Sequence, residues 1–164
     1  MRIETINRKF WSQFLDARKL ADFRLFSGVS PGDKYWLSTG AGLSHVGYGV
    51  TILRNEIHVG FGLTSASKEE NKVSFDYLYS RKDVIEATFG APLNWLRRSD
   101  RQQSYIRFSK PVDAYDERSW PEMIRWLMIH VQRLERAFKP EIDNLRRVKG
   151  SLTLSAGRED SRRE

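Results

Sequence analysis

The chain has 164 residues, the length of one domain, and its content of 40% apolar and 12% aromatic residues is typical of a folded globular protein. It contains no cysteine, which excludes disulfide bridges and thiolate metal sites, and no apolar stretch approaches the roughly 20 residues of a membrane helix. The first residues, MRIETINRKFWSQF, include an acid and no uninterrupted apolar segment, so we expect no secretory signal and a cytoplasmic protein. The formal net charge of +7 (28 basic minus 21 acidic residues) favours polyanionic partners without identifying one.

The first predicted element is a helix from Thr5 to about Phe23. Its apolar residues recur at helical spacing and share one face, and they are Phe10, Phe14, Ala17 and Ala21, widened by Trp11 and Leu15. The turn-rich stretch GVSPGDK ends the helix. A short strand over Lys34–Thr39 and a GAG loop at Gly40–Gly42 are expected next.

The segment HVGYGVTILRNEIHVGFGL, residues 45–63, predicts a hairpin with a two-residue turn at Arg54-Asn55. Pairing Leu53 with Glu56 puts only apolar residues on one face, and a shift of one residue would destroy this match. The apolar set is Val46, Tyr48, Val50, Ile52, Ile57, Val59, Phe61 and Leu63.

The same register leaves the other face of this hairpin almost without side chains. It places Gly47 opposite Gly62 and Gly49 opposite Gly60. Because glycine weakens the interior of a strand, we expect another element to approach the backbone closely here. A helix or a second chain is the simpler interpretation, and a ligand groove with a glycine floor is the alternative.

Two helices are predicted after the hairpin. Ser67-Lys68-Glu69-Glu70 is a capping box that opens a helix to about Tyr79. A second, short helix runs from about Arg81 to Phe89, where Gly90 and Pro92 stop it.

A second hairpin is predicted in LNWLRRSDRQQSYIRFSK, residues 93–110, around a turn at Ser99–Gln102. Pairing Arg98 with Gln103 puts Leu93, Trp95, Ile106 and Phe108 on one face. The other face then carries Asn94, Leu96, Arg98, Gln103, Tyr105 and Arg107. The segment holds five basic residues against one acid, Asp100, and the basic residues are Arg97, Arg98, Arg101, Arg107 and Lys110.

The longest predicted helix begins at a second capping box, Ser119-Trp120-Pro121-Glu122. Its apolar stripe is Trp120, Ile124, Leu127, Val131, Leu134 and Phe138. Pro140 interrupts the helix, and a short helical turn continues to about Val148. The pattern as a whole predicts one α+β domain over 1–148, in which an antiparallel sheet of two hairpins is packed by the N- and C-terminal helices, and a polar, disordered tail over 149–164.

No constellation of catalytic or metal-binding residues emerges. The three histidines, His45, His58 and His130, lack the spacing of a zinc site, so we expect no metal and no cofactor. The acids and base that an enzyme could use, Glu70, His58 and Asp76, share no defensible spacing, and no catalytic residue is assigned. Glu70-Asn71-Lys72 matches an acid-x-lysine pattern of nucleases, but capping and a solvated helix face explain it better.

Two stretches resemble the prokaryotic family known as domain of unknown function 4268. They are YWLSTGAGLSHVGYGV (35–50) and EENKVSFDYLYSRKDVIEATFGAPLNWLRR (69–98), the latter followed by WPEMIRWLMIHVQRLERAF (120–138). The likeness covers about Phe10 to Ile142. It implies a non-catalytic accessory domain linked to restriction, defence or repair, because related domains are similar to the C-terminal part of nuclease-like proteins; it supplies no catalytic residues.

Two hypotheses for function follow. In the first, Arg97, Arg98, Arg101, Tyr105 and Arg107 bind nucleic acid, because guanidinium groups pair with phosphates and an exposed ring stacks on a base. In the second, the glycine face of Gly47, Gly49, Gly60 and Gly62 is a protein interface, either with a nuclease subunit or in a homodimer.

Overall fold

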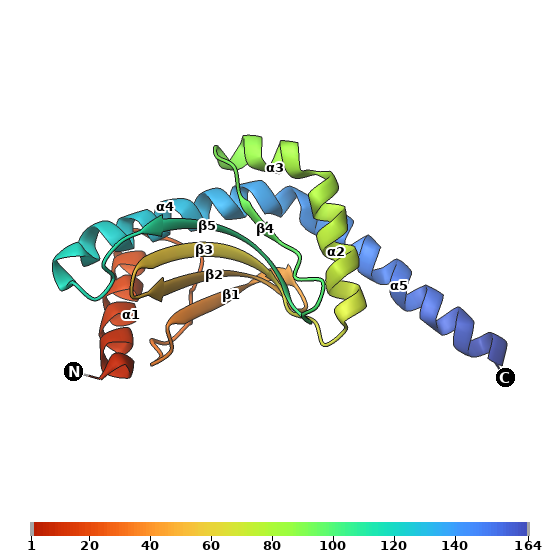
Figure 1. Cartoon of the computed structure of the whole chain (residues 1–164), viewed down its shortest axis with the longest axis horizontal. Helices are drawn as coiled ribbons and strands as arrows, with labels where there is room; N and C mark the ends of the chain where they lie inside the picture. The colour runs from red at the N-terminus through yellow and green to blue at the C-terminus, as the bar shows by residue number, and fades with distance from the viewer. Residues whose placement is uncertain (1, 164) are drawn as a thin grey trace.

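The computed structural model describes the backbone of residues 2–163 and the side chains of residues 2–152 (Figure 1). The fold is α+β, as predicted, with a five-stranded antiparallel sheet in the order β1-β2-β3-β5-β4. The strands are β1 (Trp36–Leu43), β2 (Val46–Leu53), β3 (Glu56–Leu63), β4 (Asn94–Leu96) and β5 (Ser104–Pro111). The helices are α1 (Ile3–Leu20), α2 (Lys68–Ser80), α3 (Lys82–Phe89), α4 (Trp120–Phe138) and α5 (Ile142–Arg163), with short 3₁₀ turns at Glu117–Ser119 and Lys139–Glu141.

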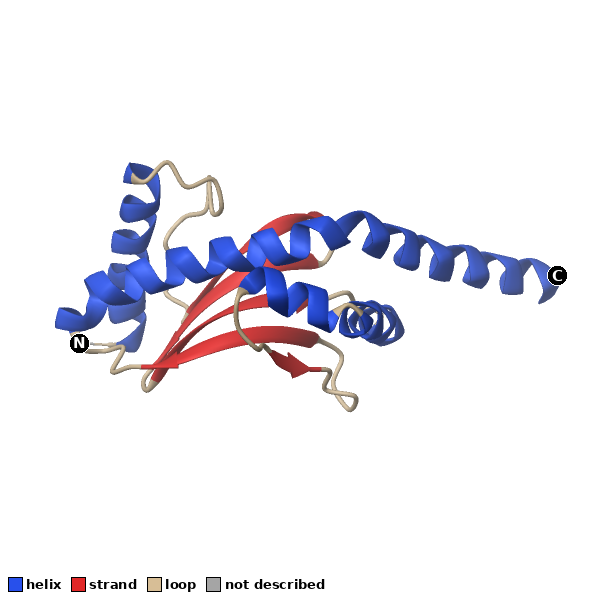
Figure 2. Ribbon diagram, turned by 90° about the horizontal axis from the view of Figure 1, so that it is seen from above, coloured by secondary structure: helices blue, strands red, loops and turns tan. Residues whose placement is uncertain are grey.

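The helices pack on one face of the curved sheet, and α4 lies along it (Figure 2). Phe138 of α4 stacks on Phe61 of β3 with ring centroids 4.3 Å apart. Phe10 of α1 meets Trp120 of α4 edge to face at 5.3 Å, which ties the first helix to the same layer. Every residue of the predicted α4 stripe is buried. The core therefore lies between the apolar face of the sheet and α1 and α4.

The predicted register of the first hairpin is confirmed throughout. Val46 pairs with Leu63, Leu53 pairs with Glu56, and the two glycine pairs lie opposite each other as expected. All eight residues of the predicted apolar face are buried. The alternation of apolar side chains and glycine is therefore sufficient to set this register.

Strand β1 is longer than predicted. The GAG segment, predicted as a loop, lies inside the strand, where the pairing with β2 shifts between Gly40 and Leu43. This irregularity adds two residues, Ala41 and Gly42, to an edge strand, and Gly42 takes a positive φ of 86° there. Bulges of this kind are common at sheet edges because they interrupt the pattern of free backbone groups.

The second hairpin has the predicted register but a shorter ladder. Leu96 pairs with Tyr105 and Asn94 with Arg107, whereas the predicted pair of Arg98 with Gln103 does not form. Arg98 has a φ of 52°, in the left-handed region, and so it leaves the strand direction. Strand β5 also pairs with β3 along its whole length, which joins the two hairpins into one sheet.

The start of α2 and the end of α3 have the capping residues predicted from the sequence, whereas the start of α4 does not. Ser67 accepts a hydrogen bond from the backbone N–H of Glu70, and Gly90 ends α3 in the left-handed conformation. Ser119, predicted as the cap of α4, makes no such bond, because it already belongs to a 3₁₀ turn whose cap is Asp116. Helical structure therefore begins at Glu117, before the start of α4 that the capping box predicts.

Helix α5 follows the break at Pro140 and extends away from the sheet to Arg163 (Figure 1). It runs past Val148, where the last helical turn was predicted to end. Most of the predicted C-terminal tail, residues 153–164, lies outside the residues whose side chains are described.

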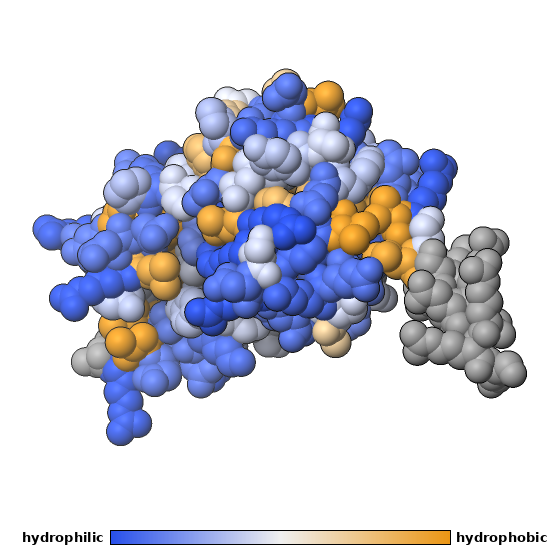
Figure 3. Space-filling view, turned by 45° about the vertical axis from the view of Figure 1, so that its right-hand side comes forward, coloured by the Kyte–Doolittle hydropathy of each residue, from blue (hydrophilic) through white to orange (hydrophobic). Residues whose placement is uncertain are grey.

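The surface is largely hydrophilic on the face seen in Figure 3, with apolar residues in separate patches. None of the described helices combines the length and the apolar character that a membrane crossing requires.

Candidate binding groove

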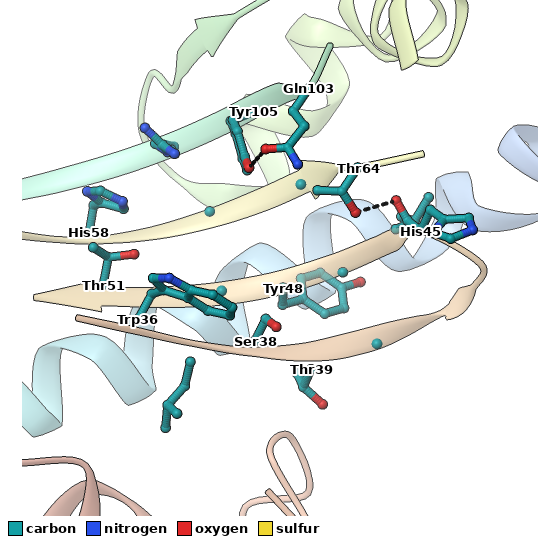
Figure 4. Close-up of a pocket in the computed structure, with 18 of the residues that line it drawn as sticks. Trp36, Ser38, Thr39, His45, Tyr48, Thr51, His58, Thr64, Gln103 and Tyr105 are labelled. Carbon is teal, nitrogen blue, oxygen red and sulfur yellow. Dashed lines mark hydrogen bonds between the residues drawn. The ribbon is translucent and has the colours of Figure 1, made fainter. Parts of the chain in front are cut away.

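The face of the sheet away from the helices forms an open groove of about 880 Å³. Its lining residues come from β1, β2, β3, β5 and the loops beside them, and none of them belongs to a helix. Figure 4 shows Trp36, Thr51, His58 and Tyr105 among the side chains on this face. The expectation that a helix covers the glycine face is therefore wrong for residues 2–152. The alternative prediction, a glycine floor beneath a groove, describes the geometry better.

The predicted glycine interface and part of the predicted nucleic-acid site lie in this one groove. In the pairing of β3 with β5, Gly60 is opposite Arg107 and Gly62 is opposite Tyr105. All four predicted interface glycines line the groove, together with Arg98, Tyr105 and Arg107 of the predicted nucleic-acid site. The two faces follow from the patterns within each hairpin, whereas their union depends on the pairing of β3 with β5.

Two of the glycines leave room for side chains of β5 that lie across the sheet. A methyl group at Gly60 would come 3.2 Å from Cγ of Arg107, and one at Gly62 would come 3.2 Å from Cε1 of Tyr105. At Gly47 the constraint is the backbone itself, because a methyl group would meet the carbonyl oxygen of Thr39 at 2.7 Å. The close approach expected over the glycine face is thus made, in part, by the sheet's own residues.

Two cations lie close to the ring of Tyr105. The guanidinium carbon of Arg107 is 4.3 Å from the ring centroid and that of Arg98 is 5.4 Å from it. The hydroxyl of Tyr105 donates a hydrogen bond to Oε1 of Gln103 (Figure 4). Burial and then the neighbouring Arg98 lower the pKa of Arg107 from its ordinary value, but a guanidinium stays protonated in proteins. The groove therefore presents two cations and one aromatic ring together.

A buried lysine holds the loop that carries Arg98. The ammonium of Lys72, on α2, donates to the carbonyl oxygens of Arg97 (2.7 Å) and Gln103 (3.0 Å) and to Oγ of Ser104 (2.8 Å). The residue is only 7% exposed, so the interpretation of this part of α2 as a solvated helix face is wrong for Lys72. Its burial lowers the pKa of the amine, and Lys68 lowers it further. Lys72 therefore fixes the two ends of the β4–β5 loop.

The other two predicted nucleic-acid residues do not line the groove. Arg97 turns toward α2 and forms a two-point ion pair with Asp76, with N–O distances of 2.8 and 3.0 Å. Arg101 lies in the exposed β4–β5 loop, beside Arg98 and Gln102 at a smaller hollow. The structure therefore brings together Arg98, Tyr105 and Arg107 and leaves Arg97 and Arg101 outside that cluster.

The aromatic residues on the opposite wall of the groove were not predicted from the sequence. Trp36 and Tyr35 line it and are 40% and 52% exposed, which is high for such large rings. Their signal in the sequence was the exposed phase of β1, since Trp36 alternates with the buried Leu37. The lining residues described include no aspartate and no glutamate.

His58 lies in the floor of the groove and is buried. Its ring is 3.7 Å from the carboxylate of Glu56, which favours the protonated form. Burial is the larger effect, and together with Arg107 it lowers the pKa of His58 to about 4. His58 is therefore uncharged at neutral pH, and Arg98 and Arg107 carry the positive charge of the groove.

The residues considered for catalysis do not converge. Glu70 pairs with Lys149, Asp76 pairs with Arg97, and His58 is in the groove apart from both. Within the part of the chain that the structure describes, no three His, Asp or Glu side chains gather closely enough to hold a metal ion. His130 packs against Phe108 and Trp126 on the helical side, where its Nδ1 is 2.7 Å from the carbonyl oxygen of Trp126.

Comparison with known proteins identifies a family. No curated protein matches the chain. A family model described as "Domain of unknown function (DUF4268)" matches residues 6–142, nearly the span over which the sequence shows the resemblance. The chain therefore belongs to the DUF4268 family.

Proposed function

We propose that the domain binds single-stranded nucleic acid in the groove, without catalysing a reaction on it. The single observation that carries the proposal is that the guanidinium groups of Arg98 and Arg107 gather at the ring of Tyr105 beside a glycine floor. Proteins that bind single strands commonly combine a positively charged groove with aromatic rings on which bases stack.

Charge complementarity supports a polyanionic ligand. The groove has two guanidinium groups and no carboxylate among its described lining residues, and the net charge of the whole chain is +7. A guanidinium binds phosphate oxygens in a two-point arrangement, which orients the ligand as well as attracting it.

The exposed rings support a single strand over a duplex. A base stacks on tyrosine or tryptophan only through its flat face, and in a duplex both faces of an interior base are covered by its neighbours. At Gly49 no side chain lies within 4 Å of the position of an added methyl group, which leaves space for a ligand to lie close to the sheet. An accessory role in restriction, defence or repair extends this proposal and rests on the family resemblance alone.

The proposal is tested by charge reversal in the groove. The double variant Arg98→Glu with Arg107→Glu is compared with Arg125→Glu with Arg133→Glu, which makes the same change in charge on the exposed side of α4. Fluorescence anisotropy on labelled oligo(dT) and oligo(U) measures the affinity, and circular dichroism checks the fold.

We expect the groove variant to lose at least about tenfold in affinity, which corresponds to roughly 1.4 kcal/mol, and the α4 variant to lose much less. Because each phosphate contact releases counterions, wild-type affinity should also fall steeply as salt rises. Equal losses in the two double variants would show that only net charge matters and would reject the groove as the binding site.

The alternative is that a second copy or a nuclease subunit covers the glycine face. A homodimer through this face would bury Arg98 and Arg107 of both copies with no carboxylate among the described lining residues to pair with them, and the cost of burying unpaired charges disfavours that contact. Light scattering distinguishes the two proposals. We expect a monomer, whereas a dimer that persists at high salt and is disrupted by Gly60→Val would support the alternative.

A further inference from the structure

The wall of the groove opposite Tyr105 carries a second exposed ring. Trp36 of β1 is opposite Thr51 of β2, which is opposite His58 of β3 in turn. This row of residues lies on the same face of the sheet as Tyr105 (Figure 4). An indole that is 40% exposed in a groove forgoes much of the hydrophobic stabilisation that its burial would supply. Because Leu37 is buried, residue 36 must face the groove, but the packing of the core does not require a tryptophan there.

The surroundings of Trp36 repeat the chemistry found at Tyr105. The ammonium of Lys34 is 5.3 Å from the centroid of the indole ring, just as Arg107 lies over the ring of Tyr105. At this end too, the described lining residues of the groove include no aspartate and no glutamate. A ring that can stack on a base and a cation that can reach a phosphate therefore occur together at both ends.

The segment that carries Trp36 is held firmly from behind. Nε1 of the buried Trp11, on α1, donates to the carbonyl oxygen of Lys34 at 2.9 Å, and Nδ2 of Asn7 donates to that of Asp33 at 3.0 Å. The carbonyl oxygen of Tyr35 accepts from the backbone N–H of Ile52 at 2.9 Å. These bonds fix the backbone from which the Trp36 side chain projects.

Between the two rings the sheet has glycine at several positions, although the side chain of Arg107 lies over Gly60. Tyr105 and Trp36 are three strands apart across the sheet and four residues apart along it, which is roughly 20 Å at the backbone. The positions between them on this face include Gly49, Gly60 and Ser38. A stacked strand rises roughly 3.4 Å per nucleotide, so about six nucleotide steps, and fewer in an extended strand, span this distance.

We propose that Trp36 is a second base-stacking platform, and that a single strand runs diagonally across the sheet from Tyr105 on β5, over the glycine floor, to Trp36 on β1. This inference rests on the proposed function, because it assigns a path and a further contact to the same ligand. It predicts that Trp36 contributes only when the ligand is long enough to reach both rings.

The test uses labelled oligo(dT) of about three and about twelve nucleotides, of which only the longer can reach both platforms. Trp36→Ala should weaken binding of the longer probe by about tenfold and leave binding of the shorter probe unchanged. Tyr105→Ala should weaken binding of both probes, and Trp36→Phe should retain most of the affinity. Tyr79→Ala, which removes a half-exposed ring on α2 outside the groove, is the matched control and should change neither affinity.

A second measurement needs no variant. Oligonucleotides with bromodeoxyuridine at one end, crosslinked to the wild-type protein by ultraviolet light, should label Trp36 only with the longer probe and Tyr105 with both.

The outcomes separate the two proposals. If the wild-type protein binds neither probe, the proposed function fails and the inference fails with it. If both probes bind but Trp36→Ala affects them equally, or affects neither, the groove remains the binding site and Trp36 is not a second platform. Crosslinking of the longer probe to Tyr105 alone would overturn the inference in the same way.

Discussion

Two glycines that face each other in the sheet, Gly40 and Gly47, have different constraints. A methyl group at Gly47 would meet the carbonyl oxygen of Thr39 at 2.7 Å, whereas nothing lies within 4 Å of one at Gly40. We expect Gly47→Ala to lower the free energy of unfolding by about 1–3 kcal/mol, since a backbone atom cannot move aside cheaply. Gly40→Ala should change it by less than about 0.5 kcal/mol. Urea unfolding measures both, and equal stabilities would contradict the account of the glycine face.

His58 predicts a dependence of stability on pH. Its pKa is about 4 in the folded protein, below the ordinary value of 6.5, so the unfolded chain binds its proton more readily. The stabilisation from the uncharged ring is therefore complete above about pH 6.5 and is lost as the pH falls toward 4. Between pH 7 and pH 5 the contribution of His58 to the free energy of unfolding should fall by about 2 kcal/mol.

The matched comparison for this pH dependence is His58→Gln, which removes the titrating group and keeps the neighbouring Glu56 and Arg107. The difference in unfolding free energy between wild type and variant should shrink as the solution is acidified. A difference that stays constant from pH 7 to pH 5 would mean that His58 is not held uncharged by its surroundings.

At the scale of secondary structure, the loop between β4 and β5 depends on α2. Lys72 holds both ends of the loop by three hydrogen bonds. Lys72→Met keeps the apolar stem and removes a donor from the carbonyl groups of Arg97 and Gln103, although Ser104 Oγ still donates to that of Arg97. We therefore expect a loss of about 2–4 kcal/mol in stability. Lys68→Met, one turn earlier and exposed, is the control.

Hydrogen exchange locates the effect of Lys72→Met. The amides of residues 97–104 should exchange faster in the variant, and affinity for oligo(dT) should fall because Arg98 and Tyr105 adjoin the held carbonyl groups. Unchanged exchange across the loop would show that Lys72 does not position it.

Local patterns predicted some of these elements well and others poorly. The β2–β3 register followed from neighbouring residues alone, because side chains must alternate between Val46, Tyr48 and the glycines. The pairing of β3 with β5 was not predicted, because α2 and α3 separate the two strands in sequence and no short-range signal links them. Ser119 matched a capping box but lies within a 3₁₀ turn, which the four-residue pattern does not distinguish from a true N-cap.

The same reasons explain which parts of the candidate site were found. Arg98, Tyr105 and Arg107 were recognised from charge and alternation within one hairpin. Their union with the glycine floor required the non-local β3–β5 pairing. Trp36 was missed because the predicted strand assigned it no face. Arg97 was included because its ion pair with Asp76 on α2 joins residues that are distant in sequence, so that no local pattern indicated it.

For the whole molecule, the sheet divides the domain into two sides with different roles. The aromatic contacts of α1 and α4 with the strands build the core on one side, and the other side is left as an open groove. Because the helices supply the stability, substitutions on the groove face that spare the backbone, such as those at Arg98 and Arg107, should leave the fold intact. The binding surface can therefore be altered separately from the core.

The most direct test is a titration of the ¹⁵N-labelled protein with oligo(dT), followed by nuclear magnetic resonance of its glycine amides. Glycines inside the groove and outside it provide an internal comparison. We predict that signals of Gly47, Gly49, Gly60 and Gly62 shift in proportion to the bound fraction, while those of Gly28, Gly32 and Gly90 do not. Binding that shifts the outer glycines and leaves the four groove glycines unchanged would contradict the assignment of this face as the site.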